Sequence, residues 1–456
     1  MATSTRPMPP DPGRGDAAVP EHIPGEPPLG SVSAGRRALR LALRAATSVL
    51  LVLLTAILWP VYLLLAARHG WAPNVPGLRQ LVRFGRLAWT VRPPDPGLTL
   101  RDRVWLSLSI LRLAATVPLL GTAWLLDELL YGDALRAVRI EAPLVEVSAA
   151  RSGSTQLARY LETDPGLVSP TLLQCVYPYL WLWRLAGRTV GRFVTREWVR
   201  ARTLGAAPPS FAERHEGDPF RTDTFEVPFL MRRGNHLSLR LGPEAMAEDF
   251  AFGPLAPHNR ELWEHDFVRV FDGIGRRTLL DAEPGPDGRP RRLFIKGHFL
   301  CAAPALARRH PDARFLTMIR EPAPRLQSAI NFLRTGPFED DLGGPPPWGW
   351  LGAGIGESEA AYCEIEQEWF TREDGPRRCV VRFSDYIRDL EGTLARVYRE
   401  CLDTPTPPDG TPRQHEPRRR HDYTYDRSLA EVGIDEAALN ARLAAYVAWC
   451  RGEDRS

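Results

Sequence analysis

The segment Leu144–Thr163 constrains the fold of this chain more than any other. It begins with an apolar run, Leu144–Val147, that predicts a buried strand, and it ends with Gln156–Glu162, which predicts the first turns of a helix. A strand, a tight turn and a helix bring several backbone N–H groups to one point, where the positive end of the helix dipole favours an anion. The segment therefore predicts a phosphate or sulfate site at the end of a strand.

The turn between them reads AARSGST over residues 149–155. Gly153 allows a close backbone approach, Ser154 and Thr155 add hydroxyl donors, and Arg151 adds a permanent positive charge. The nucleotide-triphosphate loop, G-x-x-x-x-G-K-[ST], has a leading glycine and a lysine that are missing here. A small polar turn without a ligand is the alternative interpretation of these residues taken alone.

Predicted strands and helices alternate beyond residue 140. The later strands are expected at Leu293–Ile295, Phe315–Ile319 and Val380–Phe383, and helices at Ala303–His310, Pro324–Leu333 and Leu390–Cys401. This alternation predicts an α/β protein, a P-loop-like three-layer fold with a mainly parallel central sheet. Ligands of such sheets bind at the carboxyl ends of the strands. Lys296, His298 and Arg320 follow predicted strands as the turn does, so we expect all of them at one edge.

Three regions are expected along the chain: residues 1–35, 36–137 and 138–456. The first is rich in Pro and Gly and is predicted to be disordered. The second begins with arginines and contains an uncharged stretch, Ala45–Ala67, long enough to cross a membrane as a helix that Pro60 can kink. A removable signal peptide or a twin-arginine export signal is the alternative, but the leader is long and no clear cleavage site follows.

A second apolar segment, Val104–Leu130, is interrupted by Arg112, and its charge-free part is too short to span comfortably. It can pair with the first helix as a hairpin, lie in the membrane interface, or pack on the following domain. Arginines flank both segments, so charge leaves the orientation open. We expect a membrane-associated helical region with the catalytic domain, residues 138–456, on the cytoplasmic side.

Composition excludes several classes of partner. The net charge of +3 gives no electrostatic argument for nucleic acid. The six cysteines include no C-x-x-C pair, so neither a zinc site nor a redox dithiol is predicted, and we expect buried free thiols in a reducing compartment. No acidic cluster suggests a metal site, and the oligomeric state is left open.

Several segments beyond residue 140 resemble, in order, the PAPS-dependent sulfotransferases, where PAPS is 3′-phosphoadenosine 5′-phosphosulfate. ARSGST at 150–155 looks like their 5′-phosphosulfate loop, KGH at 296–298 is similar to their Lys-x-His strand end, and MIREPAPRLQS at 318–328 looks like their 3′-phosphate motif. Residues 381–386 and 421–433 resemble later family segments. One departure is Arg151, where soluble members usually carry Lys and other branches of the family carry Arg.

The resemblance implies a role for each matched residue. Backbone N–H groups of Ser152, Gly153, Ser154 and Thr155 would bind the 5′-phosphate of PAPS, with no metal. Arg320 and Ser328 would bind the 3′-phosphate. Arg151 would face the bridging oxygen, where a guanidinium stabilises charge but cannot donate a proton.

His298 is the first candidate for the general base, because imidazole titrates near neutral pH. Lys296 would contact the transferring sulfuryl group or the bridging oxygen. Some membrane-associated sulfotransferases use a carboxylate instead, which makes Glu226 or Asp223 the alternative. A polar strand-end residue without a catalytic role is the other interpretation of His298. His421 lies in a basic run and is a further candidate for contact with the nucleotide.

Two segments of the chain are rich in aromatic residues. Tyr177, Tyr179, Trp181 and Trp183 are expected in packing rather than in an acceptor cleft. Trp348 and Trp350 lie in a Gly- and Pro-rich stretch, Gly336–Gly356, that predicts a long loop or lid.

The sequence therefore predicts a membrane-associated sulfotransferase that moves a sulfuryl group from PAPS to a hydroxyl or amine of a small-molecule, lipid or glycan acceptor. A P-loop-like kinase and a non-catalytic nucleotide-binding membrane protein of the same fold are the alternatives.

Overall fold

A computed structural model of the chain describes residues 34–93, 97–188, 218–249, 261–335, 348–408 and 428–453, with Arg196, Glu197 and Val199. The predicted disorder of residues 1–35 concerns a segment that, apart from its last two residues, lies outside these ranges. His421 lies outside them as well.

The described residues contain one five-stranded sheet. Its strands are β1 (Leu144–Glu146), β2 (Leu167–Val168), β3 (Arg292–Lys296), β4 (Arg314–Ile319) and β5 (Arg377–Arg382). The spatial order is β2-β3-β1-β4-β5, and every neighbouring pair is parallel. The predicted parallel sheet is confirmed, and β1 lies at its centre.

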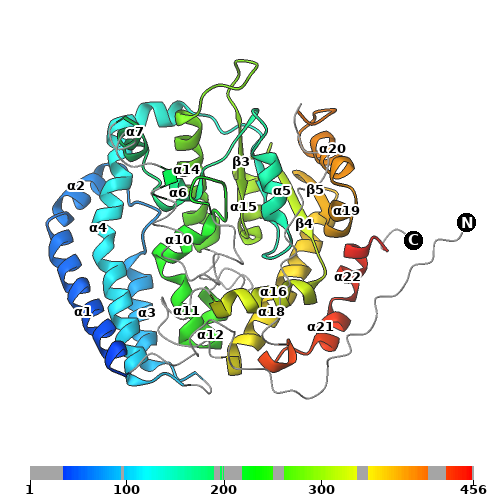
Figure 1. The fold of residues 1–456 in the computed structure, drawn as a ribbon. Coiled ribbons are helices and arrows are strands. Elements are labelled where there is room, and N and C mark those ends of the chain that lie inside the picture. The colour runs from blue at the N-terminus through cyan, green and yellow to red at the C-terminus, as the bar shows by residue number, and fades with distance from the viewer. Residues whose placement is uncertain are drawn as a thin grey trace, which may run out of the picture.

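Helices cover both faces of the sheet, as Figure 1 shows for α5 and α14 on either side of β3. The helices of this domain are α5 (Ser154–Leu161), α6 (Leu172–Val176), α10 (Glu226–Arg233), α11 (Ser238–Leu241), α12 (Pro243–Asp249), α14 (Phe267–Asp281), α15 (Ala303–Arg309), α16 (Pro322–Thr335), α18 (Trp348–Thr371), α19 (Phe383–Arg388), α20 (Leu390–Cys401), α21 (Glu436–Arg442) and α22 (Ala444–Arg451). Successive strand residues point to opposite faces. Leu144 packs in a buried cluster with α5 and α20, whereas Val145 packs in the larger cluster with α14 and α18. The sheet is thus the middle of three layers.

The N-terminal region is a set of helices packed on one long helix. Helices α1 (Ala34–Ala56), α2 (Trp59–His69) and α3 (Leu78–Thr90) contact α4 (Leu100–Ala137), and they lie together at the left of Figure 1. Between α1 and α2 the chain bends by 58°, and Pro60 lies in the first turn of α2. The expected kink is therefore a break between two helices, because proline cannot donate the backbone hydrogen bond of a continuous helix.

By length and composition, α4 can cross a membrane, and the bent pair α1–α2 counts as one further candidate. The helix runs through Arg112 and Pro118, so it is longer than the charge-free part of the second apolar segment, to which the expectation of insufficient length applied. However, 44% of its apolar window is buried within the protein, and the core helix of a soluble protein meets the same criterion. Helix α4 pairs with α1 and α2 and also packs on the domain that follows.

The contact between α4 and that domain combines apolar packing with a buried ion pair. The buried Asp127 of α4 accepts a hydrogen bond of 2.7 Å from Arg277 of α14. Asp127 also accepts the backbone N–H groups of Leu180 and Trp181 at the start of α7 (Leu180–Arg188). A hydrogen-bonded ion pair thus joins α4 to α14 within the apolar contact between them.

The predicted loop or lid at Gly336–Gly356 is wrong for its second half. Residues 336–347 lie outside the described part, but α18 begins at Trp348, and Trp350 is buried within it. Glycines predict a loop because of their low helix propensity. Here close packing outweighs propensity, since a Cβ at Gly352 would lie 1.8 Å from the carbonyl oxygen of Val432.

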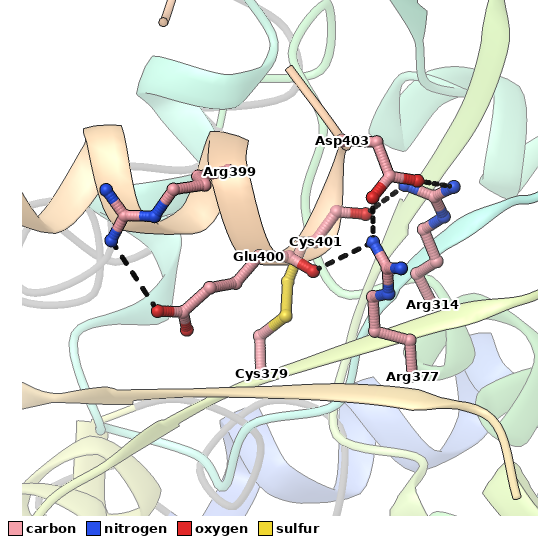
Figure 2. Close-up of a disulfide and its surroundings, with 7 residues drawn as sticks. All are labelled: Arg314, Arg377, Cys379, Arg399, Glu400, Cys401 and Asp403. Atoms are coloured by element: carbon pink, nitrogen blue, oxygen red, sulfur yellow. Dashed lines mark hydrogen bonds and ion pairs between the residues drawn. A yellow bond between two sulfur atoms is a disulfide. The ribbon is translucent and has the colours of Figure 1, made fainter. Parts of the chain in front are cut away.

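The expectation of six free thiols is also wrong. Cys379 of β5 and Cys401 at the end of α20 form a disulfide, and Figure 2 shows it next to ion pairs of Arg314 and Arg377 with Asp403. The spacing of the cysteines gave no sign of this pair, because it depends on α20 packing against β5. The remaining cysteines, Cys175, Cys301, Cys363 and Cys450, are buried and form no disulfide among the described residues.

Candidate active site

The predicted strand, turn and helix are present at the centre of the sheet. After β1 the chain turns through residues 147–153, and α5 begins at Ser154. Arg151 and Gly153 both have positive φ, 64° and 98°. The side chains of Ser152 and Ser154 are buried. The turn therefore lies against the first turn of α5, the geometry that favours an anion.

Gly153 is required by its surroundings as well as by its backbone. A Cβ at this position would lie 2.8 Å from the ring of Phe383 and 3.2 Å from the sulfur of Met318. Phe383 follows β5 and Met318 lies on β4. The backbone at Gly153 therefore packs against side chains from β4 and from the residue after β5, and a side chain at residue 153 would clash with both.

Arg151, Arg320 and Ser328 lie together. The Nε of Arg151 donates to the Oγ of Ser328 on α16 at 2.8 Å. The guanidinium of Arg320 donates to the carbonyl of Arg151 at 3.1 Å and stacks on Phe383, 4.3 Å from the ring centroid. The 5′-phosphosulfate and 3′-phosphate segments of the resemblance therefore adjoin each other.

Lys296 reaches the same turn from the neighbouring strand. It ends β3, which pairs with β1, and its Nζ donates to the Oγ1 of Thr155 at 3.0 Å. The ammonium is 1% exposed and lies 3.9 Å from a carboxylate oxygen of Asp223. A buried cation is thus held at the start of α5 by one hydroxyl and one carboxylate.

His298 is buried two residues beyond Lys296. Its Nδ1 lies 2.8 Å from the carbonyl oxygen of Ser148. A carbonyl only accepts, so in the neutral ring this contact places the hydrogen on Nδ1 and the lone pair on Nε2.

Glu226 lies beside this pair at the start of α10. Its Oε2 would be 2.1 Å from a Cβ added to Gly297, so the carboxyl lies against the backbone between Lys296 and His298. Within the described residues this buried oxygen has no hydrogen-bond partner. Burial raises the pKa of Glu226 to about 7. The structure thus brings the alternative carboxylates, Glu226 and Asp223, next to the first candidate base.

Two further residues of the site, Glu146 and Ser148, were missed in the sequence. The hydroxyl of Ser148 donates to the buried carboxyl of Glu146 and accepts the backbone N–H of Met318 at 2.7 Å. The carbonyl of Ser148 accepts from His298. Burial raises the pKa of Glu146 to about 7, and the charge of nearby Lys296 opposes that rise. The signal was a glutamate inside an otherwise apolar strand, with a serine on the same face two residues later.

The aromatic residues at 177–183 make packing and backbone contacts. Tyr179 is buried, and the indole of Trp181 donates to a backbone carbonyl of α4. The indole of Trp183 donates to the carbonyl of Tyr177, a residue that is 47% exposed. Among the described residues no group of three or more His, Cys, Asp or Glu is arranged to hold a metal ion.

Comparison with solved structures places this arrangement in a known fold. No protein-family model and no curated protein sequence matches the chain. The sulfotransferase STF9 from Mycobacterium avium is 18% identical over 85% of this chain and 95% of its own, with a TM-score of 0.57. The sulfotransferase STF1 from Mycobacterium tuberculosis H37Rv is 18% identical over 85% of this chain and 98% of its own, with a TM-score of 0.54. The chain has the fold of these bacterial sulfotransferases.

Proposed function

We propose that the protein is a sulfotransferase that moves a sulfuryl group from PAPS to a hydroxyl or amine. One observation carries the proposal: the turn at residues 149–155, Arg320 and Ser328 meet at one edge of the sheet, joined by the 3.1 Å and 2.8 Å hydrogen bonds of Arg320 and Arg151. The fold shared with bacterial sulfotransferases supports sulfuryl transfer in general.

The donor binds across this edge. The backbone N–H groups of Ser152–Thr155 hold its 5′-phosphate, as a helix start and a nest of amides can do without a metal. Arg320 and Ser328 hold the 3′-phosphate, which distinguishes PAPS from ATP. Binding exchanges the contact between Arg151 and Ser328 for charge-assisted hydrogen bonds to phosphate oxygens, which are stronger than neutral ones.

The reaction is an in-line displacement at sulfur. The acceptor oxygen or nitrogen forms a bond to sulfur as the bond from sulfur to the bridging oxygen breaks, and adenosine 3′,5′-bisphosphate leaves. Negative charge develops on the bridging oxygen, where Arg151 and Lys296 stabilise it. Removing one such donor costs about 3 kcal/mol in comparable sites. Positioning and electrostatics supply the catalysis, as in phosphoryl transfer.

The acceptor proton goes to His298 in this proposal. The contact of Nδ1 with the Ser148 carbonyl supports the role, because the neutral ring held in this way carries its lone pair on Nε2. Glu226 is the second candidate, and its buried carboxyl with a pKa of about 7 can also take a proton near neutral pH.

The acceptor is proposed to come from a membrane or a glycan. Helices α1 and α2 expose a set of large apolar side chains that a soluble surface rarely carries together: Leu39, Leu43, Val49, Leu50, Leu53, Leu54, Ile57, Trp59, Val61, Leu63 and Leu64. The exposed face of α3 adds an apolar stripe, Leu78, Val82 and Trp89, beside Arg79 and Arg86. Such a helix suits the interface of a bilayer. These faces support membrane association.

Labelled PAPS tests the proposal. The purified full chain is incubated with the donor and with lipid and glycan extracts, and transfer of label to a component of one extract is expected. Binding of adenosine 3′,5′-bisphosphate without transfer to any extract would favour the non-catalytic alternative. Tighter binding of ATP with Mg²⁺ than of PAPS would favour a kinase.

A further inference from the structure

A small cavity lies between the N-terminal helices and the segment after α10, apart from the proposed active site. Its volume is about 220 Å³. It is lined by Arg44 and Leu51 of α1, by Ser109, Arg112, Leu113 and Thr116 of α4, and by His236 of the short 3₁₀ helix η2 (Asn235–Leu237). Cavities for drug-sized ligands begin near 300 Å³, so this one suits a single small group rather than a nucleotide.

The lining is positively charged. It contains two guanidinium groups and no carboxylate. Arg44 donates to the hydroxyl of Ser109 at 3.0 Å, and Arg112 donates to the hydroxyl of Thr47 at 2.9 Å. Arg44 also stacks on Trp105, with its Cζ 4.6 Å from the ring centroid, and both guanidinium groups border the cavity. An oxyanion between them would accept charge-assisted hydrogen bonds from both.

His236 adds a polar atom to the same cavity. Its Nδ1 is shielded from solvent and has no hydrogen-bond partner among the described residues. Burial and the charge of Arg44 lower the pKa of His236 to about 4, so the imidazole is neutral at physiological pH. A neutral ring can still present an N–H donor to an anion.

The position of the cavity indicates which anion it takes. Arg44 comes directly before the uncharged part of α1, and the following turns expose Val49, Leu50, Leu53 and Leu54. A molecule with its anionic group between the arginines would therefore have apolar surface beside it along the helix. An amphipathic anion matches both features, whereas a free ion uses only the first.

We propose that this cavity binds the phosphate group of an anionic phospholipid, whose acyl chains lie along the exposed face of α1. The inference rests on the membrane association proposed above. The site is distinct from the donor edge, so it orients the protein on the bilayer without taking part in sulfuryl transfer.

Native mass spectrometry of the detergent-solubilised full chain tests the site, with a short-chain phosphatidylglycerol as the probe. One bound lipid is expected for the unmodified protein, and Arg112→Gln should weaken its affinity roughly tenfold or more, the usual effect of losing a hydrogen bond to a charged group. Arg44→Gln should act in the same direction. Arg112→Lys should keep part of the affinity because it keeps the charge.

Arg136→Gln is the matched control, because Arg136 lies on the same helix and pairs with the exposed Asp133. It should bind the lipid as the unmodified protein does. Binding of adenosine 3′,5′-bisphosphate, measured on every variant, shows that each is folded and separates this proposal from the proposed function. Unchanged lipid affinity in Arg112→Gln and Arg44→Gln would overturn the site, and equal affinity for inorganic phosphate would assign it to a free anion.

Discussion

Arg151 and Ser328 are separated by 177 positions in the chain, yet the Nε of Arg151 donates to the Oγ of Ser328 at 2.8 Å. The contact forms because β1, which precedes Arg151, pairs with β4, which precedes the helix that carries Ser328. Two segments that resemble separate phosphate motifs thereby become one continuous surface. A donor with phosphates at both ends of its sugar can use both segments at once.

Replacing Arg320 tests the 3′-phosphate end of that surface. Arg320→Ala should weaken binding of adenosine 3′,5′-bisphosphate roughly tenfold to a hundredfold, because hydrogen bonds to charged groups contribute about 1.5–3 kcal/mol each. Calorimetric titration measures the change. Arg388→Ala removes an arginine whose side chain is 76% exposed and should leave the affinity unchanged. Equal affinity in both variants would remove Arg320 from the donor site.

Turnover measurements on two variants identify the general base. His298→Ala should lower kcat roughly 10²- to 10⁴-fold, the usual contribution of a general base, and leave donor affinity within about twofold. Glu226→Gln provides the comparison. If His298→Ala keeps normal turnover and Glu226→Gln loses it, the carboxylate is the base. In that case kcat/KM of the unmodified enzyme should rise with pH through about 7 and level off above it, because the ionised form of Glu226 is the active one.

Gly153→Ala should disturb the turn. The residue has a φ of 98°, and the new methyl group would lie 2.8 Å from the ring of Phe383. Backbone strain of this kind costs about 1–3 kcal/mol. A lower thermal midpoint and weaker binding of adenosine 3′,5′-bisphosphate are both expected. Gly85→Ala, at a helical glycine of α3 with no neighbouring atom within 4 Å, is the control and should not lower either quantity. Normal binding by Gly153→Ala would show that the turn tolerates a side chain.

Stability should fall as pH rises through neutrality. Burial raises the pKa of Glu146 from 4.5 in an unfolded chain to about 7 in the fold, so the folded state binds more protons between these values. The Glu146 carboxyl therefore makes its full contribution to the free energy of unfolding below about pH 4.5. That contribution is lost as pH rises through about 7, and the loss is roughly 3 kcal/mol at most. Denaturant unfolding at pH 5 and pH 8 measures it.

Glu146→Gln isolates that contribution, because the amide does not titrate. The decrease in unfolding free energy between pH 5 and pH 8 should be smaller in this variant than in the unmodified protein. Glu357→Gln, at an exposed residue of α18, should leave the decrease unchanged. The same decrease in all three proteins would exclude Glu146 as its source.

The disulfide of Cys379 and Cys401 should stabilise the layer that carries β5. It joins residues 22 positions apart, and closing a loop of this size contributes about 3 kcal/mol, mainly by restricting the unfolded chain. Reduction, or Cys379→Ser, should lower the thermal midpoint. Alkylation of the unreduced, denatured protein should modify four cysteines and spare this pair. Modification of all six would show that the pair is reduced in the protein as isolated.

Much of the fold could be predicted because its signals are local. The apolar run before the turn at 149–155, the alternation of strands and helices, and the break near Pro60 each depend on residues close together in the chain. The first turns of helix α18 were predicted as a loop because Gly352 and Gly356 have low helix propensity. These glycines allow Val432 and Ile434 to pack close to the helix backbone, which the sequence does not reveal.

The sequence by itself determined four of the five strands of the described sheet and which polar residues lie at their ends, and hence that Lys296, His298 and Arg320 gather at one edge. Strand β2 was not predicted. Only the tertiary structure decided the contacts between segments. The position of Glu226 beside Gly297, the link of Glu146 through Ser148 to His298, and the pairing of Cys379 with Cys401 all join residues from different elements. The spacing of apolar residues along the sequence shows whether a segment is a helix or a strand. Contacts between residues of different elements depend on how those elements pack in three dimensions.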